Sequence, residues 1–335
     1  MNDINSIEKK EYYQELNILR AISIVLVILG HSFISGDNNN LLIRYIIKLI
    51  YSFHMPIFFF ISGFFALKIF NIDSNKDKLK FLKYKAKRLI IPYFIVTALA
   101  IPIKLLMNSF VKRPIVLNKL MIDIFIFPSE NPVASLWFIY TLFIIFLISI
   151  IFNRFSINIM LKISIITLIL DGFVKINIFN IYGVFRNLIF FYIGLLVRKN
   201  YTRIKKYIIK NKIKFLISTL IILLFINIVK LENQLINQIF YLITGVSGII
   251  SFGIISIEIN NFNIKNNFLN LINFYALEIY LFSWFSQNCI GYIMYKILNI
   301  NYSIIVLLTF ISGFIPIVIS KYIIRKNKIL IEIFT

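Results

Sequence analysis

Long, nearly unbroken runs of apolar residues recur along the whole 335-residue chain, and they constrain its fold more than any other feature. Several of these runs reach or approach the roughly 20 residues that a helix needs to cross a bilayer. Hydrophobic residues make up 59% of the chain and charged residues only 15%, which leaves too little polar surface to coat a water-soluble domain. The sequence therefore predicts a polytopic membrane protein.

The apolar runs are continuous rather than alternating, which favours helices over the strands of a membrane barrel. Polar breaks divide them into about ten predicted spans. The spans are residues 16–34, 46–70, 89–107, 134–152, 159–174, 181–197, 215–229, 239–257, 268–290 and 303–324. We expect residues 1–335 to form a single integral membrane domain, all-α in class. Residues 111–133 are the one sizeable connection, expected to fold as a lid or a re-entrant segment.

Basic residues set the predicted orientation. The chain has 36 Lys and Arg against 14 Asp and Glu, a net charge of +22. With the N-terminus inside, 25 of the basic residues fall in cytoplasmic segments and 9 in outer segments. This excess predicts that both termini are cytoplasmic, residues 1–15 forming an N-terminal segment and 325–335 a tail. Because the charge is spread over many short loops, it indicates contact with membrane lipids, above all at residues 76–88 and 198–214, and not with nucleic acid.

Ionisable residues inside apolar runs are costly, so each is a functional candidate. The chain has only two histidines, His31 and His54, and both lie in such runs. Arg20 precedes His31 by 11 residues, which is about 16 Å along a helix and close to a whole number of turns. Arg20 and His31 therefore share one helix face, with Arg20 near the predicted cytoplasmic end. His31 and His54 both fall in the outer half, where they could face one cavity.

The chemistry of these residues favours catalysis over metal binding. Two histidines without nearby carboxylate or Cys ligands seldom complete a metal shell, and the single cysteine, Cys289, excludes a thiolate cluster, so no metal site is expected. His titrates near physiological pH and suits general acid–base work. The alternative is that each histidine is a hydrogen-bonded packing residue between helices.

Six short motifs, in this order and spacing, resemble those of the acyltransferase family 3 membrane enzymes, in the branch that acetylates sugars and polysaccharides. They are Leu19-Arg20-Ala21-Ile22-Ser23 with Gly30-His31-Ser32, Phe53-His54-Met55-Pro56 with Phe59-Phe60-Ile61-Ser62-Gly63-Phe64, Lys87-Arg88-Leu89-Ile90-Ile91-Pro92-Tyr93, Leu136-Trp137-Phe138, Phe190-Phe191-Tyr192-Ile193-Gly194 and Leu277-Glu278-Ile279-Tyr280-Leu281. The resemblance covers nearly the whole chain. Many relatives carry a further His shortly after the last motif, where this chain has Ser283-Trp284.

The resemblance implies an O-acyltransferase of the bacterial cytoplasmic membrane. It would move an acyl group, usually acetyl, from cytoplasmic acyl-CoA to a sugar hydroxyl of a cell-envelope glycan or its lipid-linked precursor. No permanently bound cofactor is expected; acyl-CoA, the glycan and membrane lipids are the expected partners. His31 would take the proton of the acceptor hydroxyl, Arg20 would bind the donor, and His54, Ser62 and Tyr280 are candidate donors to the oxyanion. An acyl-histidine intermediate is the alternative to direct transfer.

Three of the candidate binding residues have a plainer interpretation. Arg88 is a second candidate for phosphate contact or an ordinary cytoplasmic anchor. Ser62 is a nucleophile or, with Gly63, a site of close helix packing. Trp137 would stack on a ring of the sugar or of the donor; in the plainer interpretation it anchors its helix at the membrane interface.

Three further charged residues are expected to be structural. Glu278 and Arg186 lie within spans and could pair with each other or with substrate, whereas Asp171 falls at an outer span end and is expected to be solvated. The competing function is a polytopic transporter or glycolipid flippase without covalent chemistry, in which buried Arg and His would line a substrate path.

Overall fold

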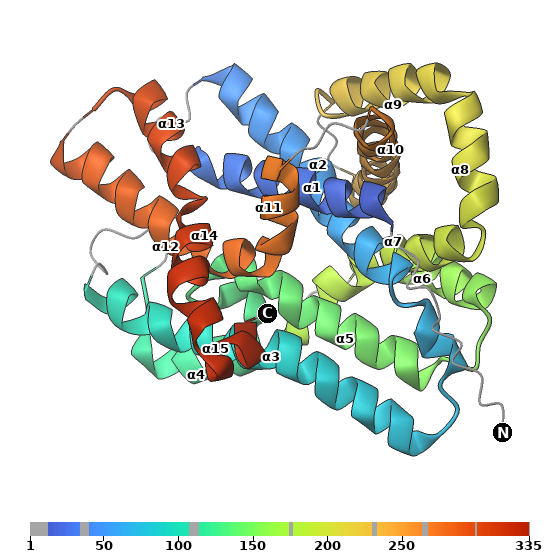
Figure 1. Cartoon of the computed structure of the whole chain (residues 1–335), viewed down its shortest axis with the longest axis horizontal. Coiled ribbons are helices and arrows are strands. Elements are labelled where there is room, and N and C mark those ends of the chain that lie inside the picture. The colour runs from blue at the N-terminus through green and yellow to red at the C-terminus, as the bar shows by residue number, and fades with distance from the viewer. Residues whose placement is uncertain are drawn as a thin grey trace, which may run out of the picture.

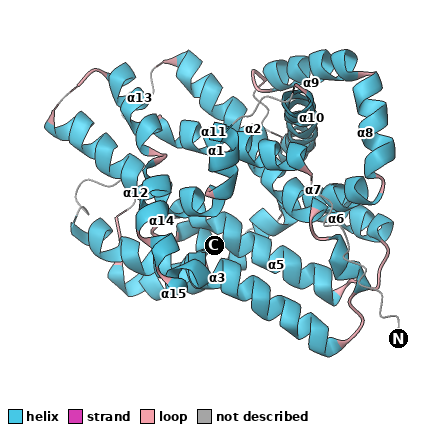
Figure 2. Cartoon of the chain, in the orientation of Figure 1, coloured by secondary structure: helices cyan, strands magenta, loops and turns pink. Residues whose placement is uncertain are grey.

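The computed structural model describes residues 13–33, 40–106, 114–173, 177–229, 233–262, 267–298 and 300–334, which form helices joined by short loops, with no strand among them (Figure 2). The α-helices are α1 (Gln14–Ser32), α2 (Leu41–Phe64), α3 (Asn75–Leu106), α4 (Leu120–Phe125), α5 (Trp137–Ile151), α6 (Ile157–Asp171), α7 (Ile181–Lys199), α8 (Tyr201–Lys210), α9 (Lys212–Ile226), α10 (Gln234–Asn261), α11 (Asn267–Phe274), α12 (Ala276–Tyr292), α13 (Tyr302–Ser312), α14 (Ile315–Tyr322) and α15 (Lys328–Phe334). The all-α class is confirmed.

Within these residues, seven helices are long and apolar enough to span a membrane, or eight if α11 and α12, which meet at a bend of 83°, form one broken span. The chain is therefore a polytopic membrane protein, but the predicted count of ten is not confirmed. The other two predicted spans correspond to α6 and α9, which have 15 residues each. At 1.5 Å per residue each is about 22 Å long, short of a hydrocarbon core of about 30 Å.

Large apolar side chains cover much of the outer surface, as a bilayer solvent requires. On α9, for example, Ile217, Leu220, Ile221 and Leu224 are all exposed. In water such a continuous apolar face would be an aggregation site, whereas lipid tails solvate it.

The most extensive contact between two helices is that of α2 with α7, where two glycines let the backbones touch (Figure 1). A Cβ added at Gly63 of α2 would lie 1.9 Å from the backbone oxygen of Phe191, and one at Gly194 of α7 would lie 2.1 Å from that of Phe60. Small residues at a membrane helix interface permit this close approach. The packing role suggested for the Ser62-Gly63 pair therefore holds for Gly63.

The connection after α3 folds back along that helix. Tyr93 donates a hydrogen bond to the carbonyl of Ile124 at 2.7 Å, and Asn131 donates to Thr97 at 2.9 Å. Tyr93 lies 13 residues before the end of α3, about 20 Å along its axis, so residues 114–133 return alongside α3 as a re-entrant segment would. Residues 111–113 of the predicted connection lie outside the described residues.

Candidate active site

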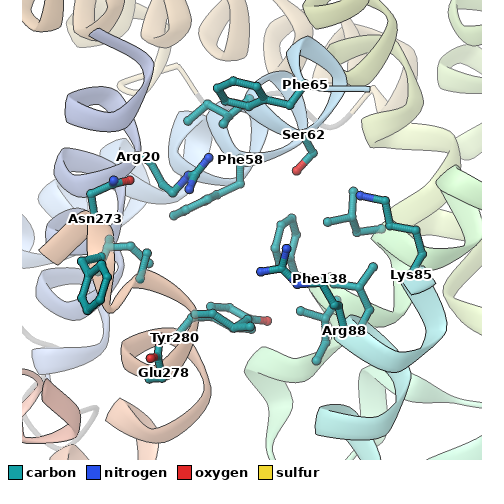
Figure 3. A pocket seen from close by; sticks show the side chains of 18 of the residues that line it. Arg20, Phe58, Ser62, Phe65, Lys85, Arg88, Phe138, Asn273, Glu278 and Tyr280 are labelled. Carbon is teal, nitrogen blue, oxygen red and sulfur yellow. The ribbon is translucent and has the colours of Figure 1, made fainter. Parts of the chain in front are cut away.

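A cavity of about 360 Å³ lies between α1, α2, α3, α5 and the break between α11 and α12. Four basic side chains line it, contributed by α1, by α3 and by the turn that follows α14, together with several polar and aromatic groups (Figure 3). The polar lining residues are Arg20, Ser62, Lys85, Arg88, Asn273, Glu278, Tyr280 and Arg325. The cavity thus brings together four of the predicted site residues, Arg20, Ser62, Arg88 and Tyr280.

Positive charge in this cavity exceeds negative charge. Glu278, the one carboxylate in the lining, accepts hydrogen bonds from Arg325 at 2.7 and 3.1 Å and from Ser320 at 3.0 Å. Within the described residues, neither Arg20 nor Lys85 forms a salt bridge: Arg20 lies 5.7 Å from the ring centre of Phe65 and Lys85 4.0 Å from that of Phe146. Cations held against aromatic faces keep their charge available, so the cavity suits a polyanionic ligand.

Lys85 corrects an expectation from the sequence. Residues 76–88 were expected to lie against lipid, but α3 begins at Asn75, so Lys85 and Arg88 are one turn apart on one helix and both line the cavity. Their three-residue spacing is a signal in the sequence that pairs them. Arg88 also donates to the hydroxyl of Tyr84 at 2.9 Å, which steadies its guanidinium.

Polar groups on the wall formed by the broken span are only partly satisfied. The hydroxyl of Tyr280 donates to the backbone carbonyl of Ser135, and its ring packs edge-on against Phe138 at 5.5 Å. Asn273 Oδ1 and Ser135 Oγ are buried and find no hydrogen-bond partner among the described residues. Asn273, a polar residue in an apolar run that the sequence analysis did not single out, thus gives the cavity an acceptor without a partner among the described residues.

The two histidines lie together but outside this cavity, on either side of one aromatic ring. The ring centre of Tyr51 is 6.1 Å from that of His31 and 5.1 Å from that of His54, and the Tyr51 hydroxyl donates to Gly30 O at 3.1 Å. His31 is exposed, whereas His54 is buried with Nδ1 2.8 Å from the carbonyl oxygen of Ile50. A carbonyl can only accept, so Nδ1 of His54 carries the proton and its Nε2 is left as an acceptor.

The residues lining the cavity do not include His31, His54 or Trp137. Trp137 instead packs against Phe59 and Phe138, with ring centres 6.3 and 6.5 Å away. The predicted site is therefore divided into a cationic cavity and a histidine pair, connected along α1 by the 11 residues from Arg20 to His31.

The last turn of α1, which carries His31, is fixed by two residues that the sequence did not single out. Gln287 of α12 donates from Nε2 to the carbonyl of Ile28 at 2.8 Å and to the hydroxyl of Ser32 at 3.1 Å. Thr309 of α13 donates to the carbonyl of Ser32 at 3.0 Å. The Thr309 bond satisfies the carbonyl of Ser32, which the helix end leaves without an intrahelical partner.

Arg186 and Glu278 both form structural ion pairs, but the suggested pairing of the two with each other and the expected solvation of Asp171 were wrong. Arg186 donates from Nε and Nη2 to Asp171 at 3.2 and 3.1 Å, and so does not pair with Glu278, whose partner is Arg325. Asp171 is buried and also accepts from Gln238 at 2.5 Å, so it is not solvated. Glu278 follows an 83° bend between α11 and α12, in a stretch that was predicted as one unbroken span.

An all-α membrane bundle with a cation-rich cavity and a nearby histidine pair defines an integral membrane protein able to hold an anionic substrate. Comparison with known families identifies it further: the model of an acyltransferase domain, that of acyltransferase family 3, matches residues 13–325. The chain belongs to this family and is a membrane acyltransferase. No curated protein and no solved structure matches it.

Proposed function

We propose that the chain is a membrane O-acyltransferase that transfers an acyl group, preferably acetyl, from acyl-CoA to a sugar hydroxyl of a cell-envelope glycan or its lipid-linked precursor. The observation that carries the proposal is the arrangement of α1, which places Arg20 in a cationic cavity and His31, exposed, three turns further on. A thioester donor has the same two parts, a polyanionic end and a distant reactive carbonyl.

The cavity would hold the anionic part of the donor. Arg20 and Arg88 offer planar forks of N–H donors, and Lys85 adds a compact charge, which together suit phosphate groups. The unpartnered acceptor of Asn273 would take a hydrogen bond from a donor amide. The carbonyl of the thioester would then lie toward His31, about 16 Å along α1 from Arg20.

His31 would act as the general base. Its imidazole takes the proton of the sugar hydroxyl while that oxygen attacks the thioester carbonyl, forming a tetrahedral oxyanion. When the C–S bond breaks, the thiolate of CoA leaves and takes the proton from His31, so the ester and free CoA are the products. An acyl group carried briefly on His31 is the alternative route, in which the imidazole attacks first and the sugar oxygen second.

His54 would play a supporting part. Because its Nδ1–H is engaged with Ile50, neutral His54 presents Nε2 as a hydrogen-bond acceptor. That form orients the acceptor hydroxyl better than it stabilises an oxyanion, which needs a donor. Two other predicted oxyanion donors, Tyr280 and Ser62, line the cavity that would hold the anionic part of the donor, and the Tyr280 hydroxyl donates to the carbonyl of Ser135. Neither hydroxyl is therefore placed beside His31, where the oxyanion would form.

The test is mass spectrometry of the envelope glycan from cells with the parent protein and with His31→Ala at equal membrane abundance. We expect the variant glycan to be lighter by one acetyl group per modified sugar. An unchanged glycan mass, with lipid-linked precursor accumulating inside cells that lack the gene, would contradict the proposal and favour a flippase.

A further inference from the structure

A second cavity of about 240 Å³ lies between α1, α2, α7, α8 and α10, and shares no lining residue with the candidate active site. It follows one face of α10, from Val246 to Ile257, where lining residues recur every three or four positions. The 11 residue steps from Val246 to Ile257 correspond to a slot about 16 Å long.

The slot is apolar except at one end. Apart from Glu15, Tyr201 and Lys205, every lining side chain is aliphatic or aromatic, or is Gly253. A Cβ added at Gly253 would meet no atom within 4 Å, so this glycine borders open space and does not fill a close helix contact. Water gains few hydrogen bonds in such a space, whereas a hydrocarbon chain is favoured there.

The polar end lies beside a basic amphipathic helix. Glu15 accepts hydrogen bonds from Lys205 at 2.5 Å and from the hydroxyl of Tyr201. Tyr201, Lys205 and two isoleucines turn one face of α8 to the slot, and basic residues on its other face are exposed. The exposed basic residues are Arg203, Lys206 and Lys210. Helices with one apolar and one basic face lie at membrane surfaces and attract anionic lipid headgroups.

We propose that this slot binds one acyl chain of an anionic glycerophospholipid, whose phosphate lies against the exposed basic residues of α8. The elongated apolar shape selects the chain, and the exposed basic residues Arg203, Lys206 and Lys210 of α8 select the headgroup. The lipid is a bound component of the fold and not a reactant, so the inference stands independently of the proposed acyl transfer.

The test reconstitutes the purified protein in equal parts of phosphatidylglycerol and phosphatidylcholine, extracts it in mild detergent and counts bound lipids by native mass spectrometry. We compare Gly253→Leu with its matched control Gly253→Ala. A leucine side chain displaces at least two methylene groups of a bound chain, so we expect about tenfold weaker lipid retention, while the alanine variant retains lipid as the parent does.

A second variant tests the headgroup without touching the slot. Arg203→Gln with Lys206→Gln should reduce the preference for phosphatidylglycerol by about fivefold per charge removed, whereas Lys326→Gln, an exposed basic residue elsewhere, should not. Retention of one phosphatidylglycerol that is lost in Gly253→Leu supports the proposal. No retained lipid on the parent, equal retention by Gly253→Leu, or no preference for the anionic lipid would overturn it.

Discussion

Replacing Arg20 with Gln should weaken CoA binding by about 10- to 100-fold. The variant keeps a polar, helix-compatible side chain but removes a guanidinium that lines the cavity and has no carboxylate partner within the described residues. A hydrogen bond to a charged group contributes about 1.5–3 kcal/mol, which corresponds to this range of dissociation constants. Lys85→Gln should act in the same direction. Both losses of CoA affinity should be smaller at high salt, because screening of the charges already weakens CoA binding by the parent protein.

Isothermal titration of CoA into the purified protein measures the effect. The matched control is Lys87→Gln, because Lys87 is on α3 beside Lys85 but pairs with Glu332 and is not in the cavity lining. We expect the control to bind CoA like the parent. The reasoning is refuted if Arg20→Gln binds CoA with unchanged affinity, or if Lys87→Gln loses as much affinity as Lys85→Gln.

Two further predictions concern packing and positioning. Gly63→Ala should lower stability by about 1–3 kcal/mol or more, because its Cβ would lie 1.9 Å from the Phe191 carbonyl oxygen. Thermal unfolding in detergent checks it against Gly253→Ala, which should be neutral or slightly stabilising; equal midpoints would contradict the α2–α7 packing. Gln287→Leu should lower acyl-transfer turnover by about tenfold without changing CoA affinity, since it loses two hydrogen bonds that fix the turn carrying His31. A matching fall in CoA affinity would show that Gln287 acts on the cavity instead.

The helical membrane class was predictable from the sequence because lipid leaves a chain few alternatives. Each apolar run must satisfy its own backbone hydrogen bonds, so continuous runs predict helices and their lengths predict spans. The predicted spans differ from the structure where a helix breaks or is too short to cross the membrane. Residues 268–290 were predicted to form one span, yet the helix breaks at Tyr275. Helices α6 and α9 have 15 residues each, too few to cross the hydrocarbon core.

The candidate site was predictable where its residues share a helix or a motif. Helical periodicity placed Arg20 and His31 on one face of one helix, but of the two only Arg20 lines the cavity, and Arg88 was singled out by its position before the third span. Lys85 was not predicted as a site residue, because basic clusters next to a span usually face lipid headgroups. Only tertiary packing brings the Lys85 side chain to the cavity. Gln287 and Asn273 are single polar residues in apolar runs, and their partners lie too far away in sequence for any local pattern to reveal.

The central claim is that donor binding and chemistry lie at different places along α1. The most direct measurement follows acetyl transfer from radiolabelled acetyl-CoA by the reconstituted protein, with acetyl-CoA affinity measured on the same samples. The account predicts that His31→Ala binds acetyl-CoA as the parent does but transfers no label, while Arg20→Gln loses affinity. Unchanged transfer by His31→Ala would contradict it.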